Sequence, residues 1–202
     1  MINYELPYKV DIGEQSFTIR NRGDYRMVLD CFDALNDTEL EPNERVACAL
    51  IIFYEDINSI SDFQKFSDLS EAVRQMYKFF NCGQDESPGA QTNYKLIDWN
   101  KDSALVSSAI NKVAGREIRA ESFLHWWTFI GYYTAIGECA LSTIVHIRYK
   151  MASGKKLEKH ERQFKQDNPQ YFAWDARTIQ QKEADDLAKS LWNGGETING
   201  GN

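Results

Sequence analysis

The residues that could do chemistry are three histidines, four cysteines and a few neighbouring carboxylates. Glu55-Asp56 and Asp85-Glu86 could be imagined as general acid and base, but such acidic pairs are common at helix ends and in loops. His125 lies in an apolar run, where a buried neutral imidazole needs a hydrogen-bond partner. We therefore interpret His125 as a histidine at the edge of the core, satisfied by backbone or a carboxylate, and not as a catalytic base.

No pattern of metal ligands or catalytic motifs accompanies these residues. The cysteines are widely separated, without a CxxC pair, which favours reduced thiols in a cytosolic protein: Cys31, Cys48, Cys82 and Cys139. The histidines have no ligand spacing within one helix: His125, His146 and His160. The motifs GxxxxGK[ST], GxGxxG, HExxH and GxSxG are all missing. The sequence therefore predicts no enzyme, no cofactor and no metal site.

The elements that would position these residues are predicted to be mainly helical. YKVDI and SFTIR alternate around Gly13-Glu14-Gln15, which predicts a β-hairpin with Val10 and Ile12 on one face. Helical periodicity then begins at the capping residue Asp24 and again near Pro42. Further helices are expected over 62–81, 101–113 and 139–152, with glycines at 83, 115 and 154 placed to end them.

The stretch FLHWWTFIGYY, residues 123–133, is apolar almost all round. We expect a helix that opens at Glu121 or Ser122 and ends at Gly137, with Gly131 allowing a neighbouring helix to approach closely. Such a helix must be covered on nearly every side, either as the central helix of one domain or by another subunit. Residues expected at a partner or oligomer interface are Trp126, Trp127, Tyr132, Tyr133, Arg148, Lys155 and Lys156.

The charge distribution limits the class of partner. The chain of 202 residues has a formal net charge of -7, which argues against general affinity for nucleic acid or an anionic membrane. Seven basic and two acidic residues make the segment 148–165 positive by five charges and leave -12 for the remainder. This segment is interpreted as a solvated helical face, although its charge could also steer self-association or an acidic partner.

The domain organisation expected from these patterns is one mainly helical domain over 1–168 with an N-terminal β-hairpin and exposed C-terminal helices. A polar C-terminal helix over 169–192 and a disordered tail over 193–202 follow. The start MINYELPYKV lacks the basic and apolar regions of a signal peptide, so none is expected. The longest apolar runs are about half the roughly 20 residues of a membrane-spanning helix.

Several blocks of the sequence resemble one family. FLHWWTFIGYY, preceded by LIDWNKDSALVSSAINKVAG and followed by STIVHIRYKMASGKKLEKHER, is similar to the phage Gp-fifteen family, over roughly residues 6 to 168. The hairpin, DYRMVLDCFDAL and MYKFFNCG also follow the family's order of elements. This family is found in tail gene clusters of long-tailed phages and prophages of Gram-positive bacteria.

The resemblance implies a function without catalytic residues. The family's genes lie between those of the major tail protein and the tape-measure protein, which implies a tail assembly chaperone that binds the tape-measure protein. The major tail protein and a second copy of the chain are further expected partners. A chaperone would act in the host bacterial cytoplasm and be absent from the mature virion. The alternative is a structural virion protein of the tail or connector, and an enzyme with an unrecognised site is the third hypothesis.

Overall fold

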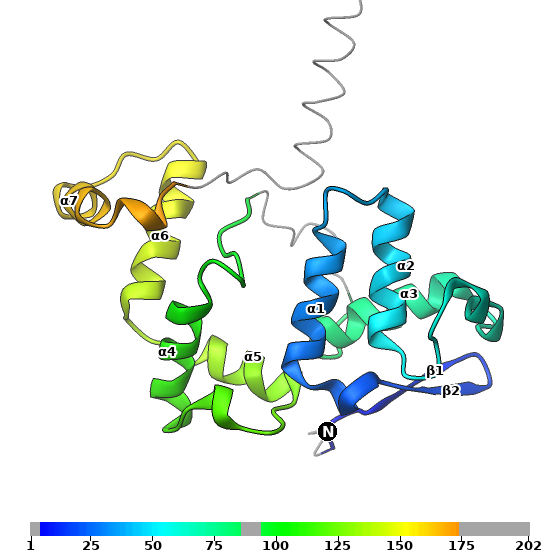
Figure 1. The fold of residues 1–202 in the computed structure, drawn as a ribbon. Coiled ribbons are helices and arrows are strands. Elements are labelled where there is room, and N and C mark those ends of the chain that lie inside the picture. Colours follow the sequence, from blue (N-terminus) through cyan, green and yellow to red (C-terminus); the bar gives the residue numbers. More distant parts are fainter. Residues whose placement is uncertain (1–4, 86–93, 174–202) are drawn as a thin grey trace, which may run out of the picture. The chain divides into compact units, whose positions relative to one another are not determined.

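The computed structural model describes residues 5–85 and 94–173, which divide between two compact units. Of the described residues, 5–85 and 99–139 belong to the first unit, and 94–98 and 140–173 belong to the second. The expected fold class is confirmed, because the described chain is mainly helical with a short N-terminal hairpin (Figure 1). The domain boundary expected at residue 168 stays a prediction. The predicted C-terminal helix and tail lie, from residue 174 onward, outside the described residues.

The first unit begins with the predicted hairpin. Strand β1 (Lys9–Ile12) pairs antiparallel with β2 (Gln15–Thr18), and Val10 lies opposite Phe17. The two-residue turn contains Gly13 at φ +62°, a backbone conformation that favours glycine. Ile12 and Phe17 are buried, so one face of the hairpin covers the helices while the other faces solvent.

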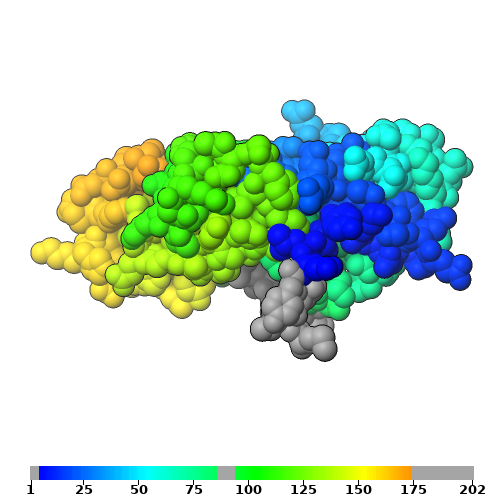
Figure 2. Space-filling view, turned by 90° about the horizontal axis from the view of Figure 1, so that it is seen from below, coloured from blue at the N-terminus to red at the C-terminus, as the bar shows by residue number. Residues whose placement is uncertain are grey.

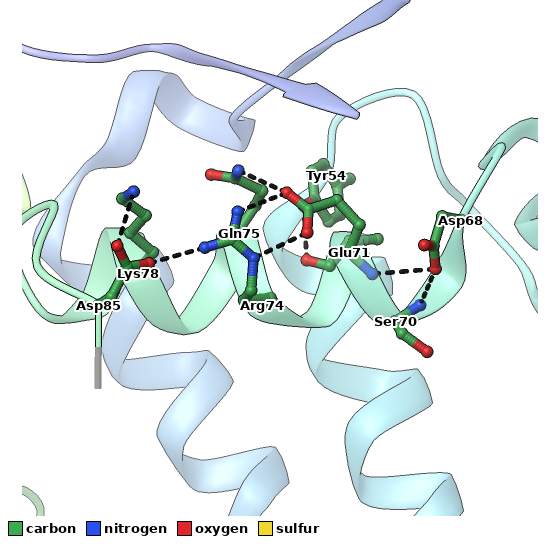
Figure 3. A network of polar contacts seen from close by, with 9 residues as sticks. Tyr54, Asp68, Ser70, Glu71, Arg74, Gln75, Lys78 and Asp85 are labelled. Carbon is green, nitrogen blue, oxygen red and sulfur yellow. Dashed lines mark hydrogen bonds and ion pairs between the residues drawn. The ribbon is translucent and has the colours of Figure 1, made fainter. Parts of the chain in front are cut away.

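Three helices form the core beneath the hairpin. The carboxylate of Asp24 accepts the Arg26 N–H and thereby caps helix α1 (Tyr25–Leu35), as predicted. Helix α2 (Pro42–Phe53) begins with a proline in its first turn and lies beside α1. Helix α3 (Leu69–Phe80) crosses both, as Figures 1 and 3 show. Their facing side chains supply fully buried residues such as Leu50, Phe53 and Met76.

The prediction of one continuous helix over residues 62–81 is wrong. A 3-10 helix (Ile60–Lys65) comes first, and α3 begins only at Leu69. Between them Phe66 is buried, with its ring centroid 4.9 Å from that of Phe17 and 5.1 Å from that of Tyr54. Asp68 then accepts the N–H groups of the next turn and starts a new helix. Tertiary packing of one aromatic ring therefore overrides a continuous helical pattern.

Helices α4 (Ser103–Ala114) and α5 (Trp126–Thr134) complete the first unit. Helix α4 ends at Gly115 in the left-handed region, as predicted. The aromatic helix is shorter than expected at its N-terminal end, because the backbone of Leu124 is held by other contacts. Its N–H donates to Asp24 and its carbonyl accepts the Tyr25 N–H, each at 2.9 Å. Residues 121–125 are thereby kept out of the helix.

The second unit contains α6 (Ala140–Ala152) and α7 (Lys159–Asp167), followed by a 3-10 turn (Pro169–Tyr171). Its apolar core includes the fully buried Ile144 and Ile147. The Arg148 guanidinium donates to the carbonyls of Tyr171, at 2.8 and 3.0 Å, and of Leu96, at 3.0 Å. One buried cation thus ties α6 to the segment that precedes α4 in sequence and to the turn after α7.

Candidate interaction surfaces

The residues expected at an interface divide between the two units. Trp126, Trp127, Tyr132 and Tyr133 lie on α5 in the first unit, whereas Arg148, Lys155 and Lys156 lie in the second. Their accessibility differs widely, from the buried Trp126 and Arg148 to the exposed lysines.

The two adjacent tryptophans satisfy the end of another helix. The indole N–H of Trp126 donates to the carbonyl of Phe80, and that of Trp127 donates to the carbonyl of Phe79, each at 2.9 Å. The last carbonyls of an α-helix have no partner within it, so these two bonds complete the C-terminal end of α3. Trp126 is only 2% exposed and offers no surface to a partner, which corrects the interface expectation for this residue.

The rest of α5 is half-buried within the first unit. Tyr132 and Tyr133 are partly accessible, and the Tyr133 ring lies 5.5 Å from that of Trp99, centroid to centroid. Burial raises the pKa of Tyr133 above its usual value. The prediction that a neighbouring helix approaches α5 closely at Gly131 is wrong, since a Cβ there would meet no described atom within 4 Å. One side of the aromatic helix therefore remains open among the described residues.

His125 has the structural role that the sequence predicts. It is 3% exposed, its Nδ1 accepts the Trp127 N–H at 3.1 Å, and its Nε2 lies 3.0 Å from the Pro7 carbonyl. A ring that accepts at Nδ1 and donates at Nε2 is the neutral imidazole. Burial is the main cause that lowers the pKa of His125, against the opposing effects of the Pro7 carbonyl and Asp24.

The described members of the acidic pairs that could have served as acid and base lie on the surface: Glu55, Asp56 and Asp85. Asp56 accepts the Thr18 N–H at 3.1 Å, and Asp85 is paired with Arg74 at 2.7 Å and Lys78 at 3.3 Å. Glu86 lies outside the described residues. Neither pair is therefore brought against a buried histidine in the described part of the chain.

The exposed face of α3 carries a network in which its charges are mutually paired (Figure 3). Glu71 accepts two bonds from the Arg74 guanidinium and one from Gln75, and these bonds lower the pKa of Glu71 to about 2. Arg74 also reaches Asp85, as does Lys78. A face whose charges are already neutralised locally offers little electrostatic attraction to a partner.

Several exposed cations of the second unit form no ion pair with another described residue. We call four of them, all exposed, the basic surface: Lys155, Lys156, Lys159 and Arg162. Lys155 lies over the ring of Tyr149, 4.6 Å from its centroid, and Tyr149 is itself 39% exposed. In the space-filling view the yellow part of the chain, near residue 150 on the colour bar, lies at the surface (Figure 2). Arg148, buried at 3%, is not part of this surface, which corrects its expected interface role.

The first unit carries a second charged surface, which was not predicted from the sequence. Residues 30–44 contain six carboxylates and no lysine or arginine. We call the five exposed ones the acidic end, because they lie where α1 ends and α2 begins: Asp30, Asp33, Glu39, Glu41 and Glu44. A count of charge along the chain would have found this run, which the helical periodicity of the same residues obscured.

The described residues contain no group of three or more His, Cys, Asp or Glu side chains that could hold a metal ion. All four cysteines are free, and burial is the largest cause that raises the pKa of the Cys31 thiol. Among the helices of residues 5–85 and 94–173, none combines the length and apolar character needed to cross a membrane.

Comparison with known proteins gives one match. A family model described as Bacteriophage Gp15 protein matches residues 2–173, which is most of the chain and includes the hairpin, all the described helices and the tryptophan pair. No curated protein and no solved structure matches.

Proposed function

Since the chain belongs to the bacteriophage Gp15 protein family, we propose that it is a non-enzymatic tail assembly chaperone that binds the tape-measure protein of a long-tailed phage or prophage. The observation that carries the proposal is the family match over residues 2–173. The sequence resemblance described above associates this family with tail gene clusters, beside the gene of the tape-measure protein. The proposed site of action is the host bacterial cytoplasm.

The accessible surface of the second unit supports such a role. Tyr149 and Met151 are 39% and 38% exposed at the end of α6, next to the cations of the basic surface. A long helical partner with an apolar stripe can be held by a few apolar anchors within a charged rim. Contacts of this kind are weak one by one, so the complex can dissociate when tail-tube subunits replace the chaperone.

The proposal is tested by co-expressing the chain with the tape-measure protein encoded beside it. We expect the tape-measure protein to stay soluble and to co-elute with the chain in size-exclusion chromatography. The double variant Tyr149→Ala/Met151→Ala removes the two exposed apolar side chains and leaves the charges of the basic surface unchanged. We expect this variant to weaken the complex. A tape-measure protein that is equally soluble alone, together with no complex after gradient sedimentation, would refute the proposal.

Mass spectrometry of purified particles separates this function from that of a structural tail or connector protein. A chaperone should be missing from the mature virion, whereas a structural protein should be present in amounts comparable with other tail proteins. Detection of the chain at such amounts would favour the structural role.

A further inference from the structure

The basic surface of the second unit is not neutralised by the described chain. None of Lys155, Lys156, Lys159 or Arg162 forms an ion pair with another residue of 5–85 or 94–173. The carboxylate of Glu161, between these residues in sequence, is buried and bound to Lys150 at 2.6 Å. Glu158 lies 3.8 Å from Lys150 and 3.5 Å from His160. The nearby carboxylates are therefore engaged elsewhere.

The acidic end of the first unit is equally unneutralised. Its carboxylates make hydrogen bonds to neutral groups: Asp33 accepts from the Asn100 amide at 2.9 Å, and Glu44 accepts the Glu41 N–H at 3.0 Å. None of the five forms an ion pair with a described residue. Burial and the neighbouring Asp33 carboxylate raise the pKa of Asp30, as expected where like charges are not balanced.

The charges on and next to α3 are paired, in contrast to those of the basic surface and the acidic end. On α3 and just after it, the carboxylates of Glu71 and Asp85 each have a nitrogen of Arg74 at 2.7 Å. At the basic surface and at the acidic end, charges of a single sign accumulate, which costs repulsion in the isolated molecule. An oppositely charged surface would relieve that repulsion at both places, and each place carries the complement of the other.

We propose that the chain associates with itself head to tail, the basic surface of one copy binding the acidic end of a second copy. Four cations then face five carboxylates. Because the two surfaces differ, the contact is heterologous and leaves one free surface of each kind at the ends of a chain of subunits. Exposed ion pairs are individually weak, so association should be weak, additive and sensitive to salt. This inference concerns contacts between copies and does not depend on the proposed chaperone function.

Charge-reversal variants test the proposal. Lys155→Glu, Lys156→Glu and Lys159→Glu together reverse the basic surface while leaving Arg162, which donates to the Leu157 carbonyl. For the acidic end, the variant Asp30→Lys, Asp33→Lys, Glu39→Lys leaves the helix-capping Glu41 and Glu44 intact. A control of equal net charge to the first variant is Lys9→Glu, Lys112→Glu, Arg116→Glu, which reverses three exposed cations elsewhere.

The readout is the weight-average mass from sedimentation equilibrium of the full chain, with circular dichroism confirming that each variant is folded. For the wild type we expect the mass to rise with protein concentration at about 50 mM salt and to approach that of the monomer at about 500 mM. Each reversal should weaken self-association at least about tenfold, which the control should not do.

Two further samples decide whether the two surfaces meet each other. An equimolar mixture of the two reversed variants should associate, because one then carries only acidic surfaces and the other only basic ones. A chain carrying both reversals should again associate with itself. The proposal is wrong if the wild type is monomeric at every concentration, if a salt-dependent change in size is independent of concentration, or if folded chains with both reversals stay monomeric.

Discussion

The side-chain Oδ2 of Asp24 accepts the backbone N–H of Leu124, 100 residues later in the chain, at 2.9 Å. The other oxygen of this carboxylate caps α1 through the Arg26 N–H, also at 2.9 Å. The Arg26 guanidinium in turn donates to the Glu121 carbonyl at 2.7 Å. One acidic residue therefore caps a helix and holds the chain that enters α5.

Replacing this carboxylate should destabilise the first unit through both contacts. Asp24→Ala removes the cap and leaves the buried Leu124 N–H without its acceptor, so we expect a loss of about 2–4 kcal/mol in the free energy of unfolding. Asp24→Asn keeps one carbonyl acceptor and should lose less. Urea denaturation measures both, and equal stability of Asp24→Ala and wild type would contradict this account.

The two tryptophans differ in what their removal leaves behind. Trp126→Phe takes the only described donor from the Phe80 carbonyl, and we expect it to cost about 1–3 kcal/mol in the free energy of unfolding. Trp127→Phe should cost less, about 0.5–1.5 kcal/mol, because the Phe79 carbonyl also accepts the Cys82 N–H at 3.1 Å. Chemical denaturation of the two variants checks this order, and the reverse order would contradict it.

Two glycines with similar backbone conformations should respond differently to alanine. Gly23 (φ +78°) and Gly115 (φ +69°) both lie in the left-handed region, which costs alanine about 1–2 kcal/mol. A Cβ at Gly23 would also lie 2.6 Å from the Cζ of Phe79 and 3.0 Å from the Nε2 of His125, whereas Gly115 has open space. We expect Gly23→Ala to be the more destabilising by about 1–3 kcal/mol.

Thermal denaturation of Gly23→Ala and Gly115→Ala measures this difference, and equal stability of the two variants would contradict it. Gly131→Ala is the control for these measurements. It lies within α5, and its added Cβ would meet no described atom within 4 Å. Alanine has the higher helix propensity, so the substitution should raise stability by about 0.5–1 kcal/mol. A marked loss of stability would show that this side of α5 is covered.

The free energy of unfolding should decrease as the pH falls through the range where histidine titrates. Because burial lowers the pKa of His125 in the folded state, the folded chain takes up fewer protons than the unfolded chain. The contribution of neutral His125 is complete above the unfolded pKa of about 6.5 and is lost as the pH falls through the folded pKa. Protonation of Nδ1 would also remove the acceptor of the Trp127 N–H.

Urea denaturation between about pH 7.5 and 5.5 tests this dependence, with His125→Gln as the comparison. The wild type should lose stability more steeply than the variant over this range. The pKa values of Glu71 and Glu117 are lowered to about 2, so both carboxylates stay ionised throughout this pH range. They therefore do not contribute to the change in the free energy of unfolding measured here. Identical slopes for wild type and variant would contradict the assignment.

Local signals in the sequence were sufficient for the hairpin, the Asp24 cap and the glycine that ends α4, because each depends on residues within a few positions. The same reasoning failed at Phe66, where a buried ring interrupts a helical pattern, and at Leu124, where contacts with α1 delay the start of α5. Helical periodicity carries no information about partners that lie far away along the chain.

The sequence by itself determined the helical class, the family and the neutral, structural character of His125, since composition, motif blocks and an apolar neighbourhood are all local properties. Only the tertiary structure decided what the two tryptophans do. Their spacing suits a core, an interface or a pocket equally well, and the choice depends on the end of α3, whose carbonyls lie 46 and 48 residues earlier in the chain. Unsatisfied backbone groups acquire partners only when the chain folds, so no local pattern could assign these bonds.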